Sequence, residues 1–557
     1  MKYLLSIGIF LFCSYFSIAQ ERLKKVEFYG KARTNLLHQN LNVEEDTTNP
    51  NKANYGHSLI DLGILIRPSN STEIITDLRI RNEHGGFFGG AVTFGVRRLT
   101  LKGIIDDKIR YNIGDIDLKI TPYTLHNNSY QTEVSEATIF SNQRSLISYE
   151  NYFKENYWRQ QGGQLEFALV YPNSKLQEID FNIFTTRHNT AVAASSTPER
   201  LFSGFSVVPK TILGNFGIHT VYLYDLKNTI NDIQLFSNRV HTLSGTLNKE
   251  FFKNYNFFFE TGYSKTKIED LISNDSNEIE DYFWNIGFKT QKIWDLHIQL
   301  NALSNGAYYR APGAQNIRLN YLTQSGVFNL IGNDQAQRPM GILDYLYNDV
   351  NYFNQFDESL DAYNPIFNNV MPYGQATPNR KGLSLQLTKK QLLEGLSLNL
   401  NGQIYSEIIG VGTEELKTFK VYQSSLNYKY NRFTIKFGVK HENTKRGGAN
   451  FEKIDLWSRQ IDGGLDIKLI NDLDFISGIK IHQASGNELL LDYDIFNNPF
   501  IMTPTFYNMK QVLSAVGLRL SFGSHSTLTT SFNIYSYEDS NIDYSINQFQ
   551  ILYKLNF

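Results

Sequence analysis

The sequence predicts an all-β protein, a single antiparallel transmembrane β-barrel with an even number of strands, roughly 16–22. Three observations predict this fold. Apolar side chains recur at every second position along most of the chain, for example in 426–430 and again in 433–439. Very short connections alternate with longer ones, as they do in bacterial membrane barrels. Beyond residue 19, no stretch approaches the ~18 consecutive apolar residues that a spanning helix requires.

The first residues, 1–19, are expected to be a signal peptide that is removed on export. Lys2 supplies the positive charge, Leu4–Phe16 the apolar run, and Ser17–Ala19 the small residues of a cleavage site. Cys13 is the one cysteine of the chain and is lost with the signal peptide. The mature chain, 20–557, then has no cysteine, which excludes disulfides, thiol catalysis and cysteine-bound metals.

Charge and hydropathy are compatible with a membrane barrel. The chain carries 53 Lys and Arg against 55 Asp and Glu, a formal net charge of −2, which gives no reason to expect nucleic acid as a partner. The mean hydropathy is −0.34. A barrel can be polar on average because only alternate residues face lipid.

The barrel is expected to begin at Val26 and Phe28, directly after the signal peptide and without an N-terminal plug domain. Segments near Ile212 and Phe251 are interpreted as weak strands or turns. Tight turns are expected at Pro68–Ser71, Asp106-Asp107, Pro172–Ser174, Asn431-Arg432, Asn471-Asp472 and Gly523–Ser526. Longer loops are expected at Asn82–Ala91, Leu125–Gln161, His188–Glu199, Asn443–Lys453 and Gln483–Asn508.

One stretch, 305–377, breaks the alternation and is rich in Asn, Tyr, Gly and Pro. Long irregular segments in a compact domain are usually functional or disordered. We expect an external loop that caps the mouth of the barrel or folds into its lumen, with a short helix within Gly341–Tyr352. The alternative is a missed pair of strands.

Five arginines fall on inward-facing positions of three neighbouring predicted strands: Arg79, Arg81, Arg97, Arg98 and Arg110. The faces follow from alternation; Leu78 and Ile80, for example, are expected to face lipid, so Arg79 and Arg81 point inward. The alternating phase flips by one residue between Arg97 and Arg98, which a β-bulge would produce. Rings of Arg favour anions in a pore, so the arginines could form a selectivity surface. They could equally be structural, paired with nearby Asp77, Asp115 and Asp117.

The segment Arg97–Gly103, followed by Asp107, Tyr111 and Asp115, resembles the early strands of the phosphate-selective porin O/P family. That resemblance implies an anion-preferring diffusion channel. The Ala19-Gln20 cleavage region and the composition, rich in Asn, Tyr and Phe, are similar to those of Bacteroidota outer-membrane proteins.

The last strand has one apolar face formed by Phe549, Ile551, Tyr553, Leu555 and Phe557. A terminal aromatic on such a strand resembles the C-terminal signature of outer-membrane barrels, which the barrel assembly machinery reads during insertion. Tyr553, Leu555 and Phe557 are the expected assembly signal.

The sequence shows no recognisable set of catalytic or metal-binding residues. His525-Ser526 lies in a predicted tight turn, while His84 and His188 lie in predicted loops without a Ser or Asp at an interpretable spacing. The Asp492–Asp494 and Glu44–Asp46 clusters fall short of a ligand set. We therefore expect neither an enzyme nor a cofactor.

The sequence thus predicts a porin-like channel of the bacterial outer membrane for passive diffusion of small hydrophilic solutes, with a preference for anions as a further hypothesis. The alternative is a non-conducting accessory barrel, a subunit of an outer-membrane assembly, secretion or surface complex. Expected partners are outer-membrane lipid, the assembly machinery, small solutes and other envelope proteins.

Overall fold

The computed structural model describes residues 25–43, 51–84, 92–126, 135–151, 160–191, 198–229, 234–247, 255–290, 296–314, 341–346, 370–372, 374–493 and 499–557. The predicted signal peptide, 1–19, and the acidic cluster Glu44–Asp46 lie outside these ranges. Within them, no helix is long and apolar enough to cross a membrane.

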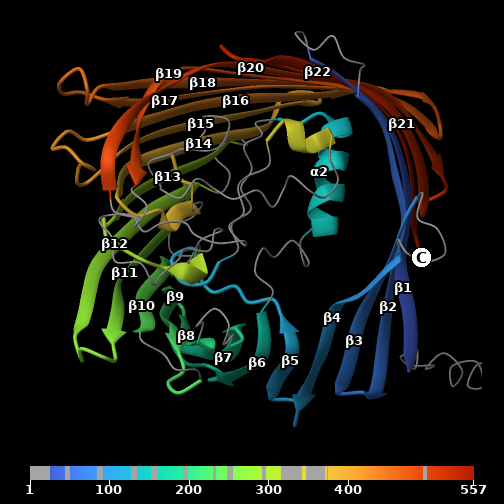
Figure 1. Ribbon diagram of the computed structural model, residues 1–557. Helices are drawn as coiled ribbons and strands as arrows, with labels where there is room; N and C mark the ends of the chain where they lie inside the picture. The colour runs from blue at the N-terminus through green and yellow to red at the C-terminus, as the bar shows by residue number, and fades with distance from the viewer. Residues whose placement is uncertain are drawn as a thin grey trace, which may run out of the picture.

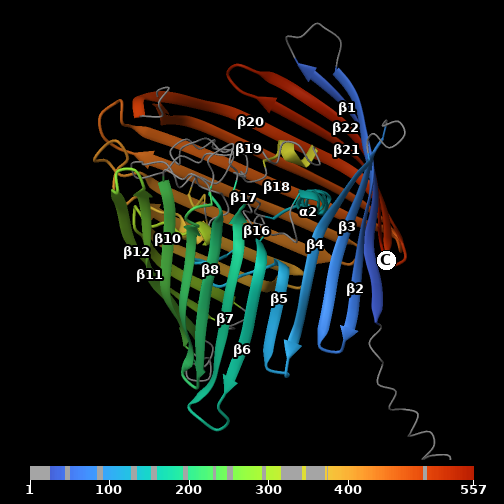
Figure 2. The same ribbon diagram turned by 60° about the horizontal axis from the view of Figure 1, so that its bottom comes forward.

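The described chain forms one barrel of 22 antiparallel strands (Figure 1, Figure 2). Each strand pairs with the next in sequence, and β22 pairs with β1 to close the wall. The fold predicted from the alternation is confirmed, and 22 is the top of the predicted range. The strands are β1 Val26–Val43, β2 Asn51–Ser69, β3 Thr72–Glu83, β4 Val92–Ile105, β5 Ile109–Ile116, β6 Gln160–Val170, β7 Leu176–Asn189, β8 Arg200–Thr211, β9 Gly214–Asp225, β10 Gln234–Leu247, β11 Tyr255–Asp270, β12 Ser276–Thr290, β13 Leu296–Asn305, β14 Arg380–Leu393, β15 Leu396–Ser406, β16 Thr418–Tyr430, β17 Phe433–Arg446, β18 Ile454–Ile470, β19 Leu473–Tyr493, β20 Pro499–Phe522, β21 Ser526–Glu538 and β22 Asp543–Asn556.

The six expected tight turns all join neighbouring strands at one end of the barrel, which we call the turn end. Backbone geometry explains one of them, since Asp106 and Asp107 have φ angles of 49° and 55°. Asp and Asn tolerate this left-handed region better than most residues. The opposite end, the loop end, carries most of the longer connections. In bacterial barrels the short turns face the periplasm.

The prediction of a long loop over Gln483–Asn508 is wrong. There β19 and β20 stay paired from Gln483 with Lys510 to Tyr493 with Pro499. Backbone pairing satisfies main-chain polar groups whatever the side chains are. Beyond the lipid no apolar face is needed, so the strands continue where the alternation fades.

The outer surface of the barrel is apolar. Its exposed side chains include Phe94, Leu99, Ile113, Ile286 and Phe532, which all lie on strands. A closed wall of strands with an apolar exterior satisfies every backbone polar group in lipid. The architecture is that of a bacterial outer-membrane β-barrel.

The seam between β1 and β22 places the last residue against a glycine. Gly30 N donates to the Phe557 carbonyl at 2.7 Å, and Phe557 N donates to Gly30 O at 3.0 Å. A Cβ on Gly30 would lie 2.6 Å from the Phe557 ring. The outward faces of Phe549, Tyr553 and Phe557 are exposed as the alternation predicts.

Two connections of the barrel enter its interior. The β5–β6 connection contains the α-helix α2, Thr138–Asn151, which lies inside the wall in Figure 1. The described parts of the β13–β14 connection contain the 3₁₀ turns η2 Pro312–Ala314, η3 Leu343–Leu346 and η5 Gly374–Ala376. Residues Ile342, Tyr345 and Leu346 share an apolar cluster with α2 and the wall strands β19–β22.

The β5–β6 connection starts earlier than the predicted loop Leu125–Gln161, because β5 ends at Ile116. The apolar alternation continues through Leu118, but Ile116 and Leu118 are buried by other interior segments and do not face lipid. Tyr123, further along, stacks on Phe283 of β12 at 4.1 Å. A period-two pattern alone does not distinguish lipid contact from interior packing.

Candidate functional site

Three of the five predicted inward arginines converge on the last turn of α2. The guanidinium of Arg79 pairs with Asp61 of β2 through two contacts of 2.7 Å and donates to the Glu150 carbonyl at 2.8 Å. Arg97 contacts Asp61 at 3.1 Å and donates to the Tyr149 carbonyl at 2.6 Å. These arginines therefore cap the last helical carbonyls, which have no partners within the helix.

The side chain of Glu150 is the second anion of this group. It pairs with Arg33 of β1, with Arg81 at 3.4 Å and with His57 at 3.3 Å. The Tyr149 ring lies under three cations, with Lys31 at 4.3 Å, Arg97 at 4.6 Å and Arg79 at 5.6 Å. We call this set the helix clamp: Lys31, Arg33, His57, Asp61, Arg79, Arg81, Arg97, Tyr149 and Glu150. Cations at a helix C-terminus are favourable, and α2 has none of its own in its last turn.

The clamp lowers the pKa of the Glu150 carboxyl. Burial alone would raise this pKa, but the contact with His57 and the charges of Arg33 and Arg81 outweigh burial. Glu150 is therefore ionised at neutral pH and holds its cations.

The other end of α2 is fixed by Lys480 of β19, whose side chain is 1% exposed. Its ammonium pairs with Glu136, just before α2, at 3.1 Å and with Asp462 of β18 at 3.0 Å. Tyr345 of η3 also donates its hydroxyl to Glu136, at 2.5 Å. One buried cation thus fastens both interior connections to the wall.

A pair of glycines makes room for this end of the helix. Gly464 of β18 and Gly478 of β19 are direct cross-strand partners. A Cβ at either position would lie 2.6–2.7 Å from the Ala137 Cβ, and at Gly478 also 2.7 Å from the Phe140 ring. The two glycines therefore form a seat for the start of α2.

The remaining two arginines have other surroundings. Arg98 pairs with Asp77 at 2.7 Å and donates to the Tyr29 hydroxyl at 2.5 Å. The expected bulge is present, because the β3–β4 register skips Arg97 between its neighbours. Asp115, a proposed counter-charge, instead accepts from Leu99 N at 2.7 Å and the Gln161 amide at 2.9 Å.

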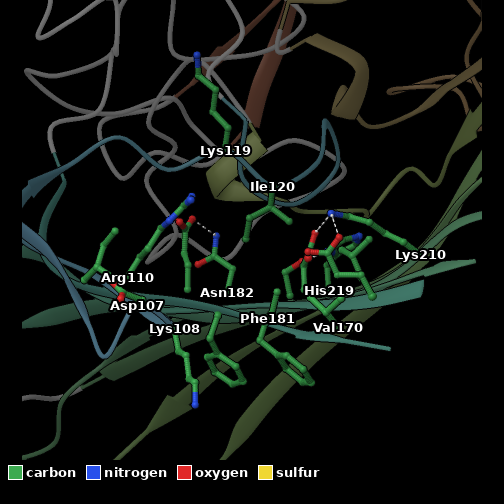
Figure 3. A pocket seen from close by; sticks show the side chains of 18 residues that line it. Asp107, Lys108, Arg110, Lys119, Ile120, Val170, Phe181, Asn182, Lys210 and His219 are labelled. Atoms are coloured by element: carbon green, nitrogen blue, oxygen red, sulfur yellow. Dashed lines mark hydrogen bonds and ion pairs between the residues drawn. The ribbon is translucent and has the colours of Figure 1, made fainter. Parts of the chain in front are cut away.

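Arg110 lines a cavity of about 750 Å³ at the turn end, between β5–β9 and the interior segment 117–120 (Figure 3). Among the described residues it has no ion pair or hydrogen bond. On neighbouring strands, Lys210 pairs with Asp180 at 2.6 Å and with Glu178 at 3.1 Å. Glu166, across from Arg110, accepts from the Gln164 amide at 2.9 Å.

The sequence did not indicate several of these residues. Strands β1 and β2 have few charged residues in a row at their inward-facing positions, and they carry Lys31, Arg33, His57 and Asp61. Glu150 lies in a segment that was expected to be a loop. These residues could have been found by looking for inward-facing charges of opposite sign on neighbouring strands. Asp61 and Arg79 are direct cross-strand partners.

Two histidines outside the clamp, His219 and His241, are held by hydroxyl groups. His219 bonds to Ser206 at 2.7 Å and to Ser244 at 2.9 Å, all on the inner wall. His525 lies in the turn between β20 and β21, as expected. Among the described residues, no group of three or more His, Cys, Asp or Glu could hold a metal ion.

No family model matches the chain, and no curated protein matches it. Among solved structures, the FrpB iron transporter from Neisseria meningitidis (F3-3 variant) is similar, with a TM-score of 0.48, 10% identity and coverage of 96% of this chain and 83% of that one. Pseudomonas aeruginosa OccK2 (OpdF) has a TM-score of 0.34 and 10% identity, covering 95% and 98%. P. aeruginosa OpdQ has a TM-score of 0.31 and 9% identity, covering 96% and 98%. Values this low assign no function, and the short resemblance to the phosphate-selective porin O/P family stays a prediction.

Proposed function

We propose that this protein is a porin-like outer-membrane channel through which small hydrophilic solutes diffuse. The observation that carries the proposal is a closed wall of 22 strands whose inner face is polar and charged. Barrels of this size enclose an aqueous channel or a plugged lumen, whereas narrow barrels are filled by their own side chains. Here α2 and the described parts of the β13–β14 connection lie inside the wall and would narrow the path.

An anion preference, if the channel has one, would arise at Arg110. Arg79 and Arg97 share the carboxylate of Asp61, and Arg81 pairs with Glu150, so their donors are occupied by the helix clamp. Arg98 is neutralised by Asp77. Of these five, Arg110 has no ion pair or hydrogen bond within the described part of the chain, so its guanidinium is available to a passing ion.

The test is single-channel conductance of the purified, refolded protein in a planar bilayer, with a salt gradient to measure ion selectivity. We expect stable ohmic steps, and we expect Arg110→Glu to shift selectivity toward cations. Arg98→Glu, which changes the charge by the same amount, is the matched control, because the Arg98 guanidinium is committed to Asp77 within the wall.

A folded barrel that stays electrically silent would refute the channel. The alternative, a non-conducting accessory barrel, would then be tested by co-purification of native partners from the outer membrane. We also propose that Tyr553, Leu555 and Phe557 present a free strand to the assembly machinery before the β1–β22 seam closes.

A further inference from the structure

Charged groups of different sign line opposite sides of the cavity at the turn end. Arg110 of β5 stands at one side, and Lys210 of β8, held by two carboxylates, stands at the other (Figure 3). Its volume of about 750 Å³ lies within the range of small-molecule pockets. It could hold a solute with several heavy atoms and its hydration water.

The Arg110 side offers donors. The guanidinium points into the cavity in Figure 3, has five N–H groups and has no partner among the described residues. The neighbouring Glu166 already accepts from Gln164 and Asn182. A carboxylate would give Arg110 the bidentate pair that its planar fork matches best.

The Lys210 side offers acceptors. Two carboxylates, Glu178 and Asp180, share one ammonium, so this side carries one negative charge in excess. All three side chains line the cavity and are about one-third exposed. A cationic amine would compensate the excess charge.

Two further lysines line the cavity, but their side chains do not point into it. In Figure 3 the side chains of Lys108 and Lys119 are directed away from the space between Arg110 and Lys210. Lys119 therefore provides a control of the same charge on the same cavity.

The segment that roofs the cavity is fixed. Leu118 is buried, Tyr123 stacks on Phe283, and Tyr309 donates its hydroxyl to the Tyr123 carbonyl at 2.7 Å. The charges therefore face a preformed space, and a ligand would not have to order the roof.

We propose that this cavity is a binding site for small zwitterions of the amino-acid or short-peptide class, whose carboxylate contacts Arg110 and whose ammonium contacts Glu178 and Asp180. The site rests on the proposed function, since it would hold a solute at the turn end of the channel. Such a site would make the channel favour one class of solute, in addition to any selectivity between ions.

The test is isothermal titration calorimetry on the full-length barrel in detergent with three five-carbon probes. These are the zwitterion 5-aminopentanoate, the dianion glutarate and the dication cadaverine. We expect 5-aminopentanoate to bind tightest. Arg110→Gln should weaken it roughly tenfold or more and leave cadaverine unchanged, because a bond to a charged group is lost.

Asp180→Asn should weaken 5-aminopentanoate and cadaverine but not glutarate, since Lys210 then balances Glu178 alone. Arg110→Lys, which keeps the charge but lacks the planar guanidinium, should restore part of the affinity, and Lys119→Gln should leave the affinity unchanged.

Each variant is tested only after its gel migration is shown to change on heating, which indicates a folded barrel. Equal affinity for the three probes, or an Arg110→Gln barrel that binds like the wild type, would overturn the site. Zwitterion binding by an electrically silent barrel would refute the channel and keep the site.

Discussion

Replacing Lys480 with Met tests whether one buried cation holds the interior connections in place. The Lys480 ammonium pairs with Glu136 at 3.1 Å and with Asp462 at 3.0 Å, and the side chain is almost wholly buried. Methionine has a similar length but no charge, so both carboxylates lose a partner. Breaking a buried ion pair costs about 3–5 kcal/mol.

The lower part of that range applies here. Glu136 keeps Arg144 at 2.6 Å and the Tyr345 hydroxyl, and Asp462 keeps the Gln460 amide at 2.9 Å. We therefore expect α2 to detach from the wall about 3 kcal/mol more easily, which corresponds to roughly a hundredfold larger detached population.

The assay is limited trypsin digestion of the full-length barrel in detergent, followed by the rate of cleavage after Arg144 on α2. Cleavage of a transiently opened segment reports the free energy of opening when closing is fast. Lys445→Met is the control, since its pair with Asp455 is solvent-exposed and worth under about 1 kcal/mol. If Lys480→Met is cleaved no faster than Lys445→Met, the fastening role is refuted.

Three more outcomes follow from contacts of the structure. Gly478→Val should loosen the start of α2, because the valine side chain would occupy the space of Ala137. The rate of trypsin cleavage after Arg144 measures this loosening. Gly30→Val should strain β1 against both of its neighbours, because its Cβ would lie 2.5 Å from the Asp61 carbonyl oxygen of β2 and 2.6 Å from the Phe557 ring; the temperature at which the folded gel band is lost should fall. Acidification should release the helix clamp. Because the pKa of Glu150 is lowered, its contribution is present above the ordinary glutamate pKa and is lost as pH falls below about 4.3.

Each outcome has a control. Gly402→Val places the same side chain where no atom lies within 4 Å, so it separates the seat of α2 from the general effect of valine in a strand. Gly95→Val is the control for Gly30→Val for the same reason. For acidification, the digestion uses pepsin, because trypsin is inactive in acid, and Glu150→Gln should remove the pH step in the rate of cleavage within α2. A step that persists in this variant would assign the release to another group.

Local sequence patterns are enough to predict the wall of the barrel. Strand positions, tight turns and the bulge at Arg97 follow from period-two alternation and turn residues, which depend only on near neighbours in the chain. The lipid-facing side of each strand follows from the same pattern. The alternation failed at its ends, over Gln483–Asn508 and at Leu118, where pairing or interior packing replaces lipid contact.

The roles of the inward charges depend on contacts between distant parts of the chain. Whether Arg97 faces a solute or caps a helix depends on Asp61, two strands away, and on Tyr149, which returns from a long connection. Arg110, which follows the same pattern, has no ion pair or hydrogen bond to another residue that the structure describes. The seat at Gly464 and Gly478 likewise exists only when Ala137 is brought to it. Alternation fixes the direction of a side chain, whereas its partner is set by contacts between residues far apart in sequence, which no local pattern records.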